Sequence, residues 1–139
     1  MKSSLQPGVS MTRRITVDRP RTVGFMGEDA RVYGTPLMIM DVEQTCRDLI
    51  MQHADPGEDS VGIEVGIKHL AATLPDMSVN IEVRVAAVEG RKVTFDVSAK
   101  DEIDTICSGM HARFVVDVAK TAERLKAKAA KRDAMKKQL

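Results

Sequence analysis

The chain has few aromatic residues, almost no net charge and no long apolar run. Its 139 residues include no tryptophan, one tyrosine and three phenylalanines, and the net charge is +1. A nearly neutral chain with so few aromatic side chains lacks the basic, stacking surface typical of nucleic-acid-binding proteins. No apolar run approaches the roughly 18 residues of a membrane span or resembles a secretion signal. We therefore expect a soluble, cytoplasmic protein that binds neither nucleic acid nor membrane.

Cysteines and common catalytic motifs are equally scarce. Cys46 and Cys107 lie far apart and form no Cys-x-x-Cys or Cys/His spacing, so we interpret them as buried thiols rather than metal ligands. The sequence has no phosphate-binding glycine-rich loop, no His-Glu-x-x-His and no Gly-x-Ser-x-Gly. We expect neither a metal nor a bound cofactor. The length indicates one domain over 1–139, with frayed ends at 1–11 and 130–139.

The segment 36–52 carries the strongest helix signal. Thr35 offers an N-cap oxygen, and Pro36 has the fixed φ that suits a first helical turn. At about 100° per residue, an apolar side forms from Ile39, Val42, Cys46, Leu49 and Ile50, and a polar side from Asp41, Gln44, Thr45, Asp48 and Gln52. Glu43 falls inside the apolar stripe, where an ionised carboxylate needs a partner or a raised pKa. Either it is functional, or it forms a surface pair with Arg47.

Alternating apolar residues predict strands at 12–17, 61–71, 77–85, 93–99 and 103–117. The odd positions of 61–71, including His69, are predicted to face the core. In the last strand we expect Ile106, Met110, Ala112, Phe114 and Val116 to point inward, and His111, Arg113 and Asp117 to point outward. The short connections predict antiparallel neighbours. From about Ala119, the Ala/Lys/Arg composition predicts a solvated terminal helix.

This order of elements predicts an α+β hot-dog fold. One long central helix can bury its apolar stripe only against the concave face of the antiparallel sheet, and a C-terminal helix follows the last strand. Glu43 and His69 then lie on opposing walls of one interior, where each perturbs the pKa of the other. They are either a catalytic pair or a structural pair. Gly62 and Gly66 share a strand face, which indicates close approach of a ligand or another backbone, a bulge, or a dimer contact.

Several short motifs resemble the fluoroacetyl-CoA thioesterase family of hot-dog proteins, from about residue 32 to 117. They are Thr35 with Glu43 eight positions later, Asp55-Pro56-Gly57-Glu58 before Ser60-Val61-Gly62, Lys68-His69 before Ala71-Ala72-Thr73-Leu74-Pro75, Val88-Glu89-Gly90-Arg91, and Ser108-Gly109-Met110-His111-Ala112-Arg113. The resemblance implies hydrolysis of acyl-CoA thioesters, with CoA as part of the substrate. It further implies that Thr35, Glu43 and His69 are catalytic and that Gly62 and Arg113 belong to the substrate site.

The chain departs from the fluoroacetyl-specific member before Thr35. That member carries lid phenylalanines there, whereas residues 26–31 here read Met-Gly-Glu-Asp-Ala-Arg. We therefore expect hydrolysis of a small acyl-CoA without specificity for the fluoroacetyl group. In the expected mechanism Thr35 polarises the carbonyl, Glu43 acts as general base or nucleophile, and His69 shuttles protons. A hot-dog hydratase or dehydratase, or a non-catalytic acyl-CoA-binding protein, are the alternatives.

The spacing of the three residues also predicts an assembly. In one regular helix Thr35 and Glu43 lie about 12 Å apart along the axis, beyond direct hydrogen-bond distance. Exposed edges of a sheet favour pairing with a second copy. We expect a homodimer or a higher oligomer, with sites at the subunit interface that draw at least one of Thr35, Glu43 and His69 from the opposite chain.

Overall fold

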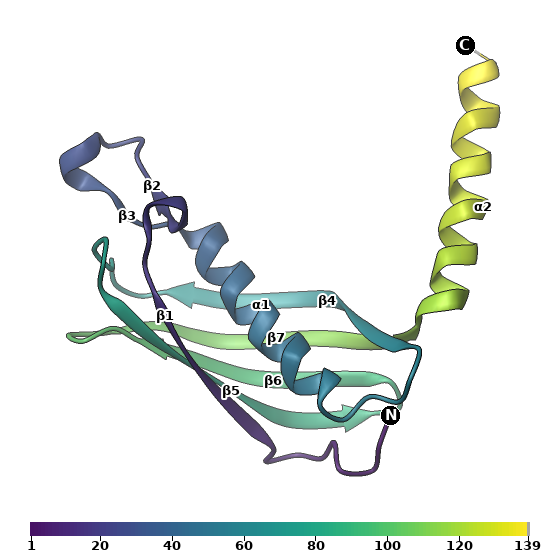
Figure 1. Cartoon of the computed structure of the whole chain (residues 1–139), viewed down its shortest axis with the longest axis horizontal. Coiled ribbons are helices and arrows are strands. Elements are labelled where there is room, and N and C mark those ends of the chain that lie inside the picture. Colours follow the sequence, from purple (N-terminus) through teal and green to yellow (C-terminus); the bar gives the residue numbers. More distant parts are fainter. Residues whose placement is uncertain (139) are drawn as a thin grey trace.

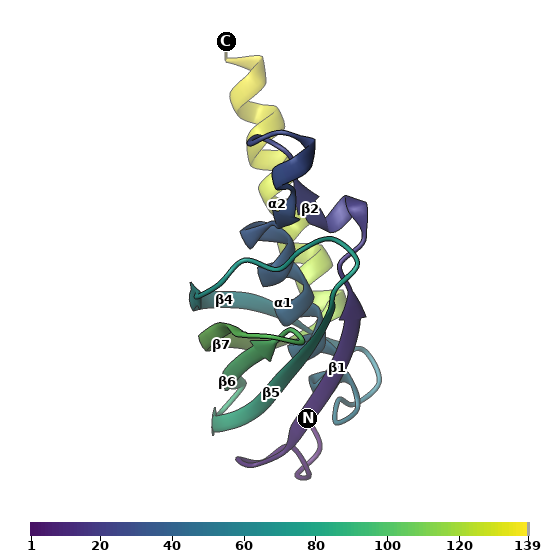
Figure 2. The same ribbon diagram turned by 90° about the vertical axis from the view of Figure 1, so that its left-hand side faces the viewer.

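The computed structural model describes residues 1–138 and contains one curved antiparallel sheet with α1 against one face (Figures 1 and 2). Five strands form this sheet in the order β1-β5-β6-β7-β4, and β2 pairs with β3 in a separate hairpin. The elements are β1 (Ser10–Thr16), β2 (Thr22–Val23), β3 (Val32–Tyr33), α1 (Thr35–Met51), β4 (Glu58–His69), β5 (Ser78–Glu89), β6 (Lys92–Lys100), β7 (Thr105–Asp117) and α2 (Val118–Lys137). The predicted arrangement of a sheet around a central helix is confirmed.

Helix α1 begins one residue earlier than predicted. Gly34 is the N-cap and provides no side-chain acceptor, while Thr35 is the first helical residue and Pro36 follows it. The expectation that Thr35 caps the helix is therefore wrong, and its hydroxyl is free to bond elsewhere. The N–H groups of the first helical turn consequently have no capping side chain.

The side of α1 predicted to be polar is partly buried. Asp41 is 7% exposed and Thr45 is fully buried. Residues 18–33 fold back over this side, where Arg21 and Tyr33 bond the Asp41 carboxylate and the Thr45 hydroxyl donates to the Asp41 carbonyl. Helical periodicity alone did not indicate this cover, because the covering segment has no regular pattern of its own.

Strand β4 is not a neighbour of β5, contrary to the prediction of consecutive hairpins. It pairs with β7 at the edge of the sheet, and the connection after His69 carries the chain across to β5 between β1 and β6. The turn at Asp76, with φ of 69°, ends this crossover. Hairpins do join β5 to β6 through Gly90 and β6 to β7 through 101–104. The consequence is that β4 has one unpaired edge within the chain.

A bulge in β4 and the register of β7 change which residues face α1. Ser60 and Gly62 lie opposite Val115 and Arg113, but after the register shift at Ile63 the odd residues of β4 share a face with His111. The predicted burial of the odd positions of 61–71 is wrong for Val61, Ile63 and Val65, whose side chains are 42–51% exposed.

The predicted faces of β7 are wrong at His111, Arg113 and Phe114, whereas Ile106 and Ala112 are buried and Asp117 is exposed, as predicted. His111, Arg113 and Val115 are buried on the α1 side, whereas Phe114 is 41% exposed on the other. The register with β6 explains this, since His111 and Arg113 lie opposite the buried Phe95 and Val93. Their polar atoms are tolerated inside because each has hydrogen-bond partners.

The two ends of the chain differ in how they contact the body. Within the segment expected to fray, Leu5 is buried in the core, the Lys2 N–H donates to the His53 carbonyl at 2.7 Å, and β1 already begins at Ser10. At the other end α2 continues through Lys137 and projects away from the sheet (Figure 1). Its residues are exposed or half-buried, as predicted. No helix within residues 1–138 is long and apolar enough to cross a membrane.

Candidate active site

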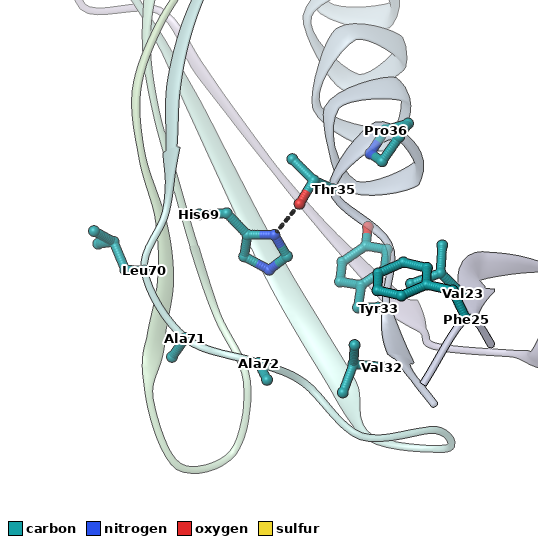
Figure 3. Close-up of a pocket in the computed structure, with 10 residues that line it drawn as sticks. All are labelled: Val23, Phe25, Val32, Tyr33, Thr35, Pro36, His69, Leu70, Ala71 and Ala72. Atoms are coloured by element: carbon teal, nitrogen blue, oxygen red, sulfur yellow. Dashed lines mark hydrogen bonds between the residues drawn. The ribbon is translucent and has the colours of Figure 1, made fainter. Parts of the chain in front are cut away.

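Thr35 and His69 meet where the start of α1 passes the end of β4. The Thr35 Oγ1 and His69 Nδ1 atoms are 2.7 Å apart (Figure 3). The other ring nitrogen, Nε2, is buried and has no hydrogen-bond partner among the described residues. Burial lowers the pKa of His69, which favours the neutral imidazole. A neutral ring with one fixed nitrogen and one unpartnered nitrogen is equipped to accept or donate a proton.

The pair lies in the wall of an open cavity of about 530 Å³. Its lining comes from the β2–β3 hairpin, the start of α1 and the chain after β4 (Figure 3). The remaining lining side chains are Val23, Phe25, Val32, Tyr33, Pro36, Leu70, Ala71 and Ala72. The wall is therefore mainly apolar, with Thr35 and His69 among its few polar groups, as is usual for a ligand pocket.

The β2–β3 hairpin is attached to α1 by buried polar contacts that the sequence did not indicate. The Tyr33 hydroxyl donates to Asp41 at 2.5 Å, and the Arg21 guanidinium donates to both carboxylate oxygens of Asp41 at 2.9 and 3.2 Å. Burial and the Asp41 carboxylate raise the pKa of Tyr33 far above its ordinary value, so the hydroxyl keeps its proton. At the tip of the hairpin, Phe25 is 82% exposed and still lines the cavity.

Sequence reasoning missed these residues for different reasons. Tyr33 and Phe25 lie in a stretch with three glycines, Gly24, Gly27 and Gly34, and without a regular helix or strand period. Asp41 was assigned to the solvent side of α1. A signal did exist, because Tyr33 is the single tyrosine of the chain and precedes the helix directly.

Glu43 occupies a different pocket. It lines a smaller cavity of about 110 Å³ together with Met40, Gln44, Arg47 and Arg113. Within residues 1–138 no hydrogen bond or ion pair to Glu43 forms, and the expected surface pair with Arg47 is absent because Arg47 bonds Asp59 at 2.7 and 2.9 Å. One chain therefore brings Thr35 and His69 together and places Glu43 in a separate pocket, not with His69.

Arg113 lines the pocket of Glu43, and Gly62 is its neighbour across the sheet. Arg113 is 6% exposed and lies opposite Gly62 across the β4–β7 ladder. A Cβ atom on Gly62 would come within 3.2 Å of His111 Cε1 and 3.5 Å of Arg113 Nη1. Gly62 thus leaves room for these two side chains. Burial lowers the pKa of Arg113, and the Glu43 charge opposes that shift.

The described residues include neither a cluster of metal ligands nor a reactive thiol. Among residues 1–138 no group of three or more His, Cys, Asp or Glu side chains is placed to hold a metal ion. Cys46 and Cys107 are free and buried, as interpreted from sequence, and burial raises the pKa of these thiols to about 12 and about 11. Thiols with such pKa values remain protonated near neutral pH and are poor nucleophiles.

Solved thioesterases have the same fold. The structure of the fluoroacetyl-CoA thioesterase superimposes with a TM-score of 0.82 at 29% identity, covering 89% of this chain and 97% of that one. A thioesterase superfamily member from Thermus thermophilus gives 0.85 at 28% identity, over 92% and 96%. A point mutant of the fluoroacetyl-CoA-specific enzyme in complex with fluoroacetate and CoA gives 0.79 at 31% identity, over 84% and 99%. The expected hot-dog fold is confirmed, and the class is that of the hot-dog thioesterases.

The sequence comparisons give the family. The model of the fluoroacetyl-CoA-specific thioesterase family matches residues 17–119. The fluoroacetyl-CoA thioesterase of Streptantibioticus cattleyicolor is 32% identical over 127 residues, which cover 86% of this chain and 91% of that protein. The chain belongs to the fluoroacetyl-CoA-specific thioesterase family, and it is a thioester hydrolase.

Proposed function

We propose that this protein hydrolyses a small acyl-CoA to the free acid and CoA, using Thr35, His69 and Glu43. The observation that carries the proposal is the Thr35–His69 pair, whose unpartnered Nε2 atom lies beside an apolar cavity. A buried nitrogen without a partner costs free energy unless a ligand or water satisfies it. A thioester in this cavity supplies atoms that require proton transfer during hydrolysis.

The start of α1 is suited to polarise the thioester carbonyl. Gly34 leaves the N–H groups of the first turn without a side-chain cap, and the positive end of the helix dipole favours a developing oxyanion there. Thr35 lies in this turn and holds His69 through its hydroxyl. His69 then transfers a proton toward the departing thiolate, since a thiol is a better leaving group than a thiolate.

Glu43 completes the set as general base on water or as nucleophile giving a transient anhydride. Because α1 is regular from Thr35 onward, Glu43 of the same chain lies about two turns from Thr35. We propose that Glu43 reaches the thioester from a second subunit. The unpaired edge of β4, with exposed Val61, Ile63 and Val65, is the surface on which two copies pair antiparallel.

Antiparallel pairing of β4 with its own copy explains how the pockets combine. Such pairing puts the end of one β4, which carries His69, beside the beginning of the other, near Ser60. Arg113 bonds Ser60, and Glu43 lines the same pocket as Arg113. The Thr35–His69 pocket of one subunit is thereby brought toward the Glu43–Arg113 pocket of the other. The proposed homodimer has two equivalent composite sites.

We propose a small acyl group and leave its identity open between fluoroacetate and others. The relative named for fluoroacetyl-CoA supports a short acyl chain, and the CoA complex of another supports CoA as the carrier. The β2–β3 hairpin places Phe25 over the cavity but has Met-Gly-Glu-Asp-Ala-Arg at 26–31. We propose no metal or bound cofactor, and a cytoplasmic location, which suits two free thiols.

A panel of acyl-CoA thioesters assayed with a thiol reagent tests the reaction. Release of CoA by the wild-type protein, with kcat lowered ~10²-fold or more in Glu43→Gln and KM little changed, supports the proposal. Glu123→Gln, the same substitution at an exposed position of α2 outside both pockets, is the control and should retain activity. Conversion of an enoyl or 3-hydroxyacyl thioester without CoA release would identify a hydratase or dehydratase. Binding without any turnover would identify an acyl-CoA-binding protein.

Labelled water separates the two roles of Glu43. In a single turnover in oxygen-18 water, only the anhydride route can leave label in the Glu43 carboxylate, through attack of water on the Glu43 carbonyl carbon of the anhydride. The general-base route leaves the enzyme unlabelled. Mass spectrometry of the peptide that contains Glu43 distinguishes these outcomes.

A further inference from the structure

The Arg113 guanidinium is held by three contacts inside the sheet. Nε donates to Ser60 Oγ at 2.7 Å, Nη2 donates to the Ser60 carbonyl at 2.8 Å, and Nη1 is 3.2 Å from His111 Nε2. A guanidinium has five N–H groups, so two remain, one on Nη1 and one on Nη2. The same side chain lines the pocket of Glu43. Its remaining donors are the groups available to a ligand in that pocket.

His111 can make its two contacts in only one protonation state. Its Nδ1 is 2.8 Å from the Glu64 carbonyl, which only accepts, so Nδ1 carries a hydrogen. Its Nε2 faces Arg113, which only donates, so Nε2 must be unprotonated. The neutral Nδ1–H tautomer satisfies both neighbours. A doubly protonated ring would place an N–H against the N–H of a cation.

The surroundings of His111 favour that neutral form. The ring is fully buried, and burial and the Arg113 charge both lower its pKa. The hydrogen bond to the Glu64 carbonyl of β4 and the Glu43 carboxylate of α1 act in the opposite direction and raise this pKa. At Gly62 of β4, a Cβ atom would come within 3.2 Å of the ring. Groups from α1, β4 and β7 therefore all surround the contact between His111 and Arg113.

We propose that His111 is a positioning residue that acts through Arg113. Its neutral ring fixes the guanidinium so that two N–H groups face the pocket of Glu43, where they bind the acyl-thioester oxygen or the carboxylate of the product. Protonation of His111 breaks this contact and releases Arg113. Acyl-CoA binding then weakens as the pH falls. The inference rests on the proposed acyl-CoA function and adds to it a residue and a pH dependence.

Two variants separate positioning from simple structure. His111→Gln retains a donor for the Glu64 carbonyl and an acceptor for Arg113 but does not titrate. His111→Phe keeps the size of the ring and leaves Arg113 without this acceptor. Their affinities for a non-hydrolysable acyl-CoA thioether are measured from pH 5 to 8, with His69→Gln as the control that removes a different titrating ring.

We expect wild type and His69→Gln to lose affinity as the pH falls, whereas His111→Gln has a nearly flat profile. His111→Phe should bind ~30-fold more weakly at pH 8, since a buried charge loses a hydrogen-bond partner. Equal pH profiles in wild type and His111→Gln would overturn the proposal, even if His111→Phe fails to fold. Nitrogen-15 NMR gives a second readout, and a protonated Nε2 in His111 at pH 8 would also overturn it.

Failure of the proposed function looks different. If the wild-type protein neither hydrolyses nor binds any acyl-CoA, the function is wrong, and the tautomer of His111 is still read by NMR. If wild type hydrolyses acyl-CoA but His111→Phe and His111→Gln bind the thioether as wild type does at every pH, only the inference about His111 fails.

Discussion

The Thr35 hydroxyl and the His69 ring are 2.7 Å apart although 34 positions separate them in sequence. This contact fixes Nδ1 and leaves Nε2 free for substrate. Thr35→Val keeps the shape of the side chain and removes the hydroxyl, so we predict a ~10- to 100-fold loss in kcat. Thr35→Ser restores the hydroxyl and should recover most of the activity. Steady-state kinetics of the two variants checks this, and equal activities would contradict the role of the hydroxyl.

Stability should fall on mild acidification. Burial lowers the pKa values of His69 and His111 below the ordinary value of about 6.5. The unfolded chain therefore takes up protons first as the pH falls through about 6.5, and the loss of stability continues until the folded pKa values are reached. We predict a lower Tm at pH 5.5 than at pH 7.5, with a smaller difference in His111→Gln. Identical differences in both proteins would contradict this assignment.

The contact between Tyr33 and Asp41 should stabilise the hairpin over the cavity. Tyr33→Phe removes the hydroxyl that donates to the buried carboxylate, which keeps only its Arg21 contacts. We predict that the free energy of unfolding falls by about 1–3 kcal/mol and that KM rises because the cavity wall loosens. Phe25→Leu, at the exposed tip, should leave stability within about 0.5 kcal/mol. Urea unfolding measures the stability of the two variants, and steady-state kinetics measures the KM of Tyr33→Phe. A Tyr33→Phe protein as stable as wild type would refute the prediction.

The exposed edge of β4 should carry the subunit contact. A lysine at Ile63 or Val65 puts a charge on this edge, and we predict that Ile63→Lys or Val65→Lys yields monomers and abolishes most turnover. Leu125→Lys on α2 replaces an exposed apolar residue outside the edge and should remain dimeric and active. Sedimentation at the assay concentration provides the test. Dimers of unchanged stability in both β4 variants would place the interface elsewhere.

Much of the fold follows from local patterns. The spacing of apolar residues predicted α1 and all five strands of the sheet to within a few residues, because periods of 3.6 and 2 are strong signals in long elements. The order of the strands was not predicted correctly. The short link after His69 is typical of a hairpin in its sequence, but in the structure it crosses the sheet from β4 to β5. The burial of His111, Arg113 and Phe114 in β7 was predicted wrongly because both faces of that strand carry apolar residues, and only its pairing with β6 selects the inner face.

The candidate site was predicted in part, because two of its residues lie at the ends of elements with strong apolar patterns. Thr35 and His69 each end or begin a strong element, so their elements were found even though their hydrogen bond is a tertiary contact. Glu43 was expected opposite His69, but its place along α1 puts it over Arg113 instead. The roles of Ser60 and His111 depend on a bulge at Ile63. A single inserted residue in a ladder leaves no signal in a pattern of period 2.

Subunit mixing tests the central claim, a thioesterase site built from two chains. Glu43→Gln and His69→Ala are each inactive by this account, and are co-expressed with different tags so that the mixed dimer can be purified. We predict that the mixed dimer regains one intact site of two, and hence about half the activity of a wild-type dimer, while each parent stays inactive. Mixed dimers without activity, or a wild-type protein that is an active monomer, would contradict the account.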